Sequence, residues 1–288
     1  MGRIIWLASY PKSGNTWLRA FLANLVLDRK EPLPINDLKA FTLSDTRPRF
    51  YAAASGQALE ALDLNDAEVV ALRPKVQEMI AAERPHDHFV KTHSIYGKVG
   101  GHPLFAPTLS AGVVYVARNP LDVIPSYAAH FNLSLDQAIL ALESRENCSP
   151  TAGASIGYVM GRWCDHVESW MSNKQIPCIV LRYEDLATRP LQVFGHLAKT
   201  LGIAGDPERL QRAIDFSSFK ELSRQERESD FSERPPHADR FFRSGKVGAG
   251  ADLLSAAQRD RVIKVQGPMM RRLGYLDDAG KLTKQVTA

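Results

Sequence analysis

The chain has 288 residues, and its 36 lysines and arginines against 32 acidic residues give a formal net charge of +4. Its apolar fraction of 44% and charged fraction of 24% are those of an ordinary soluble globular protein with a substantial core. The small, scattered charge excess speaks against a nucleic-acid groove, and no stretch approaches the roughly 20 apolar residues of a membrane span. The three cysteines lack metal-ligand spacing and the N-terminal apolar run is too short for a signal peptide, so we expect a cytoplasmic protein.

Short apolar runs rich in β-branched residues alternate with helical patterns along the chain. The predicted strands are 4–8, 89–92, 113–117 and 179–181. The predicted helices are 18–26, 66–83, 121–131, 134–143, 155–172, 190–201, 207–226 and 255–273. This alternation predicts one α/β domain over residues 1–288, in which helices flank a central parallel sheet. The polar stretches 143–155 and 224–239 are predicted to be loops.

The stretch SYPKSGNTW follows the first predicted strand and precedes the first helix. Ligands of α/β sheets bind at such junctions, beyond the carboxyl ends of the strands. Gly14 lets the backbone approach an anion closely, and the free N–H groups of the helix start favour negative charge. Lys12 adds a positive charge, and further donors come from Ser13, Asn15 and Thr16. Because the lysine precedes the glycine, this is not a Walker A loop; a plain turn capped by Asn or Ser is the alternative.

A second strand-loop-helix junction lies in VVYVARNPLDVIPSYAAHF. Asn119 followed by Pro120 is typical of a helix N-cap with proline at the first helical position. Arg118 ends the strand, where a guanidinium can hold a phosphate through two hydrogen bonds. Without the neighbouring motifs, the alternative is that Arg118 is a solvated arginine at the end of a strand and binds no phosphate. Pro125 is expected to kink or delay the helix.

A third stretch, HFVKTHSIYG, places Lys91 and His93 at the end of a predicted strand. A histidine is suited to accept a proton near neutral pH, which makes it a candidate general base. Histidines that lack such neighbours are more often structural or solvated. The neighbouring motifs therefore decide how this residue is interpreted.

Taken together, these stretches resemble the motifs of sulfotransferases that use 3′-phosphoadenylyl sulfate (PAPS) as the sulfuryl donor. SYPKSGNTW resembles the family's 5′-phosphosulfate loop, close to YPKSGTTW, and HFVKTHSIYG resembles its K-T-H segment. The eight-residue spacing between Arg118 and Ser126 is similar to that of the family's 3′-phosphate pair. YEDL, SSFKEL and FFRSGKVG are similar to three later family segments, in family order. In the last of these, Ser244 replaces the usual lysine and GAGAD replaces G-D-W, so Lys246 is a candidate for the missing charge.

The resemblance implies a P-loop-NTPase-like sulfotransferase fold, PAPS as co-substrate, PAP as the desulfated product, and no metal. It implies that His93 is the general base, that Lys12 stabilises the leaving phosphate, and that Lys91 stabilises charge near the transferring group. The co-substrate would be bound by residues from all of these segments, namely Lys12, Ser13, Gly14, Asn15, Thr16, Trp17, Arg118, Ser126, Tyr183, Ser217, Phe219, Arg243, Ser244 and Gly245. The short chain resembles the soluble bacterial members of the family that modify natural products more than the Golgi-membrane ones.

The expected acceptor is a small molecule with a hydroxyl or an amine; no nucleic acid or membrane partner is expected, and a homodimer stays open. Acceptor residues are expected on the loops 33–56, 95–110 and 224–242. The aromatic residues of these loops line an apolar pocket or cover the core, and they are Phe41, Phe50, Tyr51, Tyr96, Phe105 and Phe231. The alternatives are a kinase or nucleotide hydrolase with a variant phosphate loop, against which the missing Walker A motif speaks, and an inactive PAP-binding relative, against which His93 speaks.

Overall fold

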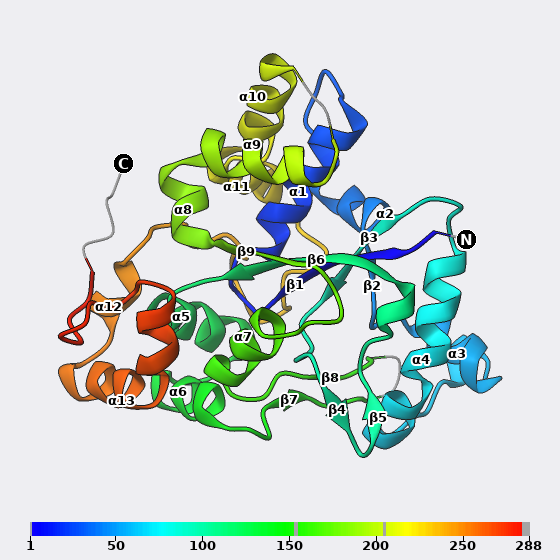
Figure 1. The fold of residues 1–288 in the computed structure, drawn as a ribbon, viewed down its shortest axis with the longest axis horizontal. Helices are drawn as coiled ribbons and strands as arrows, with labels where there is room; N and C mark the ends of the chain where they lie inside the picture. The colour runs from blue at the N-terminus through cyan, green and yellow to red at the C-terminus, as the bar shows by residue number, and fades with distance from the viewer. Residues whose placement is uncertain (1, 153–154, 204–205, 284–288) are drawn as a thin grey trace. The chain divides into compact units, whose positions relative to one another are not determined.

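The computed structural model describes residues 2–152, 155–203 and 206–283 (Figure 1). Gly153 and Ala154, which belong to the predicted loop 143–155, lie outside the described residues. The chain forms two compact units, each assembled from three segments of the sequence. Unit 1 consists of Met1–Tyr10, Thr42–Tyr115 and Ala141–Val180, and unit 2 of Pro11–Phe41, Val116–Leu140 and Leu181–Ala288. A single domain over residues 1–288 therefore stays a prediction.

The central sheet has five strands in the order β2-β3-β1-β6-β9, and the predicted parallel α/β class is confirmed. The strands are β1 (Ile4–Ser9), β2 (Leu43–Ser44), β3 (His88–Thr92), β6 (Ser110–Ala117) and β9 (Cys178–Arg182). Four of the five were predicted; β2 was missed because two residues carry no periodicity. Both β1 and β2 pair with β3 in parallel, and Ala8 lies opposite Thr92. The carboxyl ends of β1 and β3 therefore meet at one edge of the sheet.

The helices of unit 1 include α4, which was predicted almost to the residue. They are α3 (Pro48–Ser55), α4 (Asp66–Ala82) and α7 (Trp163–Met171), with short 3₁₀ turns at Leu59–Ala61 and Pro107–Leu109. A capping box between Asn65 and Glu68 begins α4. The predicted helix 155–172 is wrong in its first half, because β8 (Tyr158–Val159) pairs with β7 (Cys148–Ser149) and α7 begins only at Trp163. A second small antiparallel pair is formed by β4 (Lys98–Val99) and β5 (His102–Pro103).

The helices of unit 2 pack in two groups, one in which α1 packs against α10 and α10 against α9 and α11, and one in which α5 packs against α12 and α13 (Figure 1). They are α1 (Asn15–Leu27), α2 (Leu38–Phe41), α5 (Pro120–Phe131), α8 (Tyr183–Thr188), α9 (Pro190–Thr200), α10 (Pro207–Phe216), α11 (Phe219–Ser229), α12 (Ala249–Leu253) and α13 (Ala256–Arg272), with a 3₁₀ turn at Ile35–Asp37, while α6 (Leu135–Glu143) continues into unit 1. The predicted helix 207–226 is wrong as a single helix, because Ser218 caps a new helix by accepting from the Glu221 N–H. Since α11 extends to Ser229, the predicted loop 224–239 begins only after that residue.

The N-terminal boundary of α5 agrees with the prediction. The Asn119 side chain accepts a hydrogen bond from the Leu121 N–H at 3.0 Å, and Pro120 is the first helical residue. Pro125 lies inside the helix, which nevertheless runs from Pro120 to Phe131, so the expected delay is wrong. No helix of the described residues combines the length and the apolar character that crossing a bilayer requires.

Each unit has its own apolar core. Trp6, Trp163 and Trp170 are fully buried in unit 1. A cluster in unit 2 is formed by Ala20, Ala23, Leu33, Ile35, Leu38, Leu222 and Phe231, against which Trp17, Phe41, Phe241 and Phe242 pack. Among the aromatic residues of the proposed acceptor loops, four are buried, namely Phe50, Tyr51, Phe105 and Phe231. These four residues therefore cover the core and do not line an open apolar pocket.

Candidate functional site

The SYPKSGNTW loop has an unusual backbone. Lys12 has a φ of 67° and Gly14 a φ of 106°, both in the left-handed region. Such a loop directs successive backbone N–H groups to one side and forms an anion-binding nest. Gly14 is also the N-cap of α1, so the positive end of a helix dipole, which favours an anion, follows directly. Because Asn15 already lies inside the helix and Gly14 occupies the cap position, the alternative of a turn capped by Asn or Ser is wrong.

Glycine at position 14 is required for a second reason. A Cβ atom there would lie 2.7 Å from Cδ2 of Tyr183, the tyrosine of the YEDL segment. The Tyr183 ring also contacts Trp17, with 5.3 Å between the ring centroids. Two segments that lie far apart in the sequence thus meet at the start of α1, as expected for parts of one binding site in unit 2.

Arg118 joins this group from the end of β6. Its guanidinium lies over the Tyr183 ring, with Cζ 4.2 Å from the ring centroid. Nη1 donates to the Lys12 carbonyl at 3.2 Å, and Nη2 donates to the Lys246 carbonyl at 3.5 Å. The Arg118 residue is only 9% exposed. The phosphate loop, the Arg118 motif and the closing segment are therefore brought together, with a buried positive charge among them.

Several buried polar atoms in this region, Nε1 of Trp17 among them, have no hydrogen-bond partner within the part of the chain that the structure describes. Two of these atoms are Oγ of Ser13 and Nε of Arg118. Buried donors without a partner are rare, because each carries the cost of losing water. Both atoms can donate to an oxyanion, and they accompany the nest formed by Lys12 and Gly14. The donor set fits a phosphate or sulfate group.

The closing segment FFRSGKVG is anchored at three points in unit 2. Tyr183 donates from its hydroxyl to the Gly245 carbonyl at 3.1 Å. The Phe219 ring lies where a side chain at Gly245 would stand, since a Cβ atom there would be 2.4 Å from Phe219 Cδ2. Arg243 donates through Nη1 to the Pro125 carbonyl at 2.8 Å, one residue before Ser126. Four of the predicted co-substrate residues (Tyr183, Phe219, Arg243 and Gly245) are thus connected to one another or to α5.

Asp122 was not among the predicted site residues. Its carboxylate accepts from the Gly248 N–H at 2.8 Å and from the Gly250 N–H at 2.7 Å. A Cβ atom at Gly250 would lie 2.2 Å from the Leu121 carbonyl oxygen. The GAGAD sequence that departs from the family pattern therefore forms a tight anchor on α5, and no local signal in the sequence marks Asp122 as its partner.

Other predicted residues are placed differently. Ser217 is fully buried, and its hydroxyl donates to the Ala213 carbonyl at 2.8 Å, which closes the last turn of α10. Phe219 is 38% exposed, whereas Ser126 is half-buried on α5 and Ser244 is exposed. Lys12 Nζ lies 3.6 Å from the centroid of the Phe241 ring, a contact that was not predicted. Binding of the co-substrate by Ser217 stays a prediction.

His93 belongs to unit 1, where it follows β3. Its Nδ1 lies 2.8 Å from the carbonyl oxygen of Ser9, at the end of β1. Because a carbonyl only accepts, Nδ1 must carry the hydrogen, and the neutral ring then has its lone pair on Nε2. This is the tautomer that a general base acting through Nε2 requires. Lys91 is half-buried on β3, opposite Leu7.

A second histidine supports the backbone of His93. Nε2 of His166 donates to the His93 carbonyl at 3.1 Å, so Nδ1 of His166 accepts from the Tyr115 hydroxyl at 2.8 Å. Complete burial lowers the pKa of His166 to about 4, and the hydrogen bond to His93 opposes this shift only in part. His166 is therefore neutral at pH 7. Sequence reasoning missed it, because it gave this segment only a helical pattern.

Comparison with known proteins agrees with these observations. The family model of the sulfotransferase domain matches residues 3–274, and the chain therefore belongs to the sulfotransferase family. Flavonol 3-sulfotransferase of Flaveria bidentis is 28% identical over 263 residues, which cover 85% of this chain and 74% of that protein.

Two solved structures show the same fold. Mouse sulfotransferase SULT7A1 complexed with PAP has a TM-score of 0.60 at 21% identity, covering 96% of this chain and 86% of that one. Retinol dehydratase in a complex with retinol and PAP has a TM-score of 0.63 at 18% identity, covering 93% and 81%. The predicted family and fold are thus confirmed, while the roles of the individual residues stay predictions.

Proposed function

We propose that this chain transfers the sulfuryl group of PAPS to a hydroxyl or amine of a small organic molecule. The observation that carries the proposal is the nest at Lys12 and Gly14, together with the buried donors Ser13 Oγ and Arg118 Nε, in a chain of the sulfotransferase family. The relatives support the co-substrate, because the matching structures were solved as PAP complexes.

In this proposal the residues of unit 2 hold the co-substrate. The N–H groups that follow Gly14 and the hydroxyl of Ser13 bind the 5′-phosphate, and Arg118 binds the 3′-phosphate. PAPS supplies an activated sulfuryl group and leaves as PAP. Sulfuryl transfer, like phosphoryl transfer, proceeds through a loose in-line transition state, so positioning and charge stabilisation account for most of the catalysis. Lys12 supplies the positive charge that stabilises the negative charge growing on the leaving oxygen.

His93 acts on the acceptor. The Nδ1–H bond to the Ser9 carbonyl leaves Nε2 as the basic nitrogen, which accepts the proton of the attacking hydroxyl. Lys91 balances charge near the transferring group. The named relatives act on a flavonol or bind retinol, and both molecules carry a hydroxyl on a largely apolar body. We therefore propose an apolar alcohol or phenol as the acceptor class.

The test is PAP formation from PAPS with a panel of phenols, flavonols and retinoid alcohols, with the sulfated product identified by mass spectrometry. We expect His93→Ala and Lys12→Ala to lower kcat at least about 100-fold while the circular dichroism spectrum stays unchanged. Exposed residues of the same types outside the proposed site provide matched controls, namely His196→Ala and Lys30→Ala, and these should keep the wild-type rate. A wild-type kcat in His93→Ala or Lys12→Ala would remove that residue from its role. Transfer of phosphate from ATP in place of sulfate would refute the proposal.

A further inference from the structure

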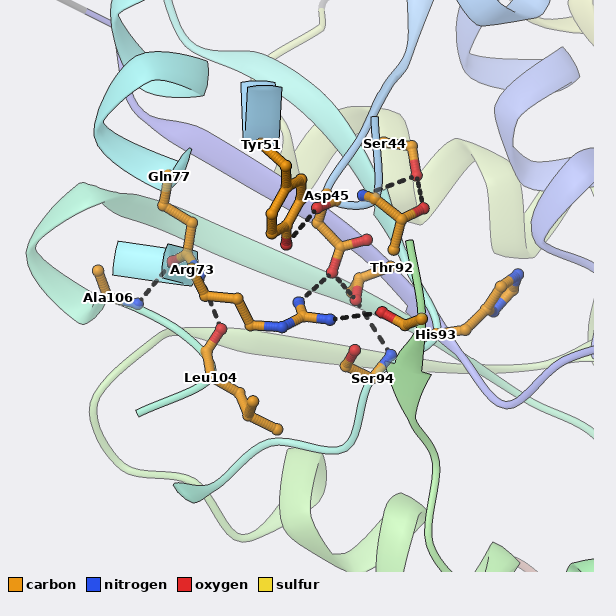
Figure 2. Close-up of polar contacts among 12 residues, drawn as sticks. Ser44, Asp45, Tyr51, Arg73, Gln77, Thr92, His93, Ser94, Leu104 and Ala106 are labelled. Atoms are coloured by element: carbon orange, nitrogen blue, oxygen red, sulfur yellow. Dashed lines mark hydrogen bonds and ion pairs between the residues drawn. The ribbon is translucent and has the colours of Figure 1, made fainter. Parts of the chain in front are cut away.

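A chain of buried polar contacts leads to His93 from the interior of unit 1 (Figure 2). Asp45 and Arg73 are 3% and 1% exposed, and Arg73 Nη1 lies 2.9 Å from Oδ2 of Asp45. The same carboxylate oxygen accepts from the Thr92 hydroxyl at 2.8 Å, and Thr92 Oγ1 accepts from the Ser94 N–H at 3.1 Å. We infer that Asp45, Arg73 and Thr92 form a positioning network that fixes the orientation of His93 for proton transfer.

The direction of each hydrogen bond follows from chemistry. A carboxylate only accepts, so the Thr92 hydroxyl must donate its hydrogen to Asp45. Its oxygen is then left to accept from the Ser94 N–H, which closes a tight turn around His93. The residues before and after His93 are thus linked through a single hydroxyl, and the Asp45 carboxylate sets the orientation of that hydroxyl. In Figure 2 the His93 ring points away from the ion pair, so the network acts on its backbone.

The ion pair is itself held from several elements. The Asp45 N–H donates to the Lys91 carbonyl at 3.2 Å, which extends the β2–β3 pairing beyond β2. The Tyr51 hydroxyl donates to the Asp45 carbonyl at 3.1 Å, and burial raises the pKa of Tyr51 to about 12, so this donor is retained at working pH. Arg73 comes from α4 and also donates through Nη2 to the Gly157 carbonyl at 3.2 Å. Asp45 therefore has little freedom to move relative to β3.

Stability alone does not account for this arrangement. A buried ion pair adds little net stability, because removing both charges from water offsets their attraction. Although Arg73 Nε has no partner among the described residues, the other contacts of the network hold Asp45 and Thr92 in a single fixed geometry. Here the network positions His93, the residue proposed as the general base, and misplacing a catalytic group by about 1 Å can lower the rate about 100-fold.

The test centres on Thr92→Val, which removes the hydroxyl and leaves Asp45 and Arg73 paired. Removal of either charge would leave its partner buried and unpaired, so those variants are prone to misfolding. This inference rests on the proposed function, since it takes His93 to be the base. We expect Thr92→Val to lower kcat about 10- to 100-fold with the KM for PAPS within about twofold of wild type. Thr92→Ser, which keeps the hydroxyl, should recover most of the rate.

A matched control comes from another buried hydroxyl of unit 1. Ser110 Oγ also accepts one hydrogen bond, from Trp6 Nε1 at 2.9 Å, and donates one, to the Ala106 carbonyl at 2.8 Å. Ser110→Ala therefore removes the same number of contacts without touching the turn around His93. It should lower the melting temperature as much as Thr92→Val does and leave kcat unchanged. An equal loss of kcat in Ser110→Ala would overturn the inference.

A second readout does not depend on activity. Nitrogen-15 NMR of the imidazoles, with His93→Gln to assign the signal, reports the His93 tautomer. The wild type should show the Nδ1–H form, and Thr92→Val a mixture of both tautomers. A His93 spectrum that Thr92→Val leaves unchanged would overturn the inference, whatever happens to kcat. If the wild type transfers no sulfuryl group to any acceptor, the proposed function fails, whereas these spectra still decide whether the network positions His93.

Discussion

The buried His166 makes a prediction for the pH dependence of stability. Its pKa is lowered by burial from 6.5 to about 4. As the pH falls below about 6.5, the unfolded chain therefore binds a proton at this residue while the folded protein does not, and the free energy of unfolding decreases. The two pKa values lie about 2.5 apart, and each pH unit corresponds to about 1.4 kcal/mol, so the full loss is about 3.5 kcal/mol, of which about 3 kcal/mol has occurred by pH 4. Between pH 7 and pH 5 the loss is about 2 kcal/mol.

Urea unfolding at a series of pH values between 7 and 5 measures this loss. His166→Gln removes the titrating ring and keeps an amide donor for the His93 carbonyl. The variant is expected to be less stable than the wild type at pH 7. Between pH 7 and pH 5, its free energy of unfolding should lack the decrease of about 2 kcal/mol that His166 causes in the wild type. His196→Gln replaces an exposed histidine on α9 and should keep the wild-type slope. Equal slopes in the wild type and His166→Gln would show that His166 is not held neutral by burial.

The remaining predictions concern unit 2. Arg118→Ala should weaken PAP binding about 10- to 100-fold in calorimetry, because charge-assisted hydrogen bonds contribute about 1.5–3 kcal/mol. The PAP affinity of Arg118→Lys should lie between those of the wild type and Arg118→Ala, since lysine keeps the charge but not the planar fork. Unchanged PAP affinity in Arg118→Ala would refute the 3′-phosphate assignment. Gly245→Ala should lower both stability and PAP affinity, because its φ is 62° and its Cβ would meet Phe219 at 2.4 Å. Gly56→Ala is the matched control, since its φ is 78° with nothing within 4 Å of the added atom. Equal effects of the two glycine substitutions would mean that backbone strain, and not the Phe219 contact, is responsible.

The parts of the fold that follow local rules were predictable from the sequence. The strand before SYPKSGNTW, the Asn119 cap and helix α4 with its capping box all lie where periodicity and capping residues indicated. The errors fall where a contact between segments overrides a local pattern. Residues 155–162 have helical periodicity, yet the pairing of β8 with β7 delays α7. The break at Ser218 is a capping signal in the middle of an amphipathic run, and it was overlooked.

The candidate site divides in the same way. Residues of the motifs were predicted, because charged side chains and hydrogen-bond donors follow the ends of β1, β3 and β6 in the sequence. Residues that act through a long-range contact were not predicted. Asp45 and Arg73 are 28 positions apart in the sequence and lie in no motif, so nothing local marks them as partners. Asp122 was visible as a residue of α5, but its partners Gly248 and Gly250 are more than a hundred residues away.

The central claim is that the SYPKSGNTW loop and Arg118 form a site for the sulfate donor nucleotide. A thermal shift experiment with PAP, 5′-AMP and ADP plus magnesium at matched concentrations tests it most directly, because a ligand that binds only the folded state raises the melting temperature. We predict a large increase with PAP, a smaller one with 5′-AMP, which lacks the 3′-phosphate, and none with ADP and magnesium. An increase with ADP and magnesium together with no response to PAP would contradict the claim and assign the loop to a nucleotide of another class.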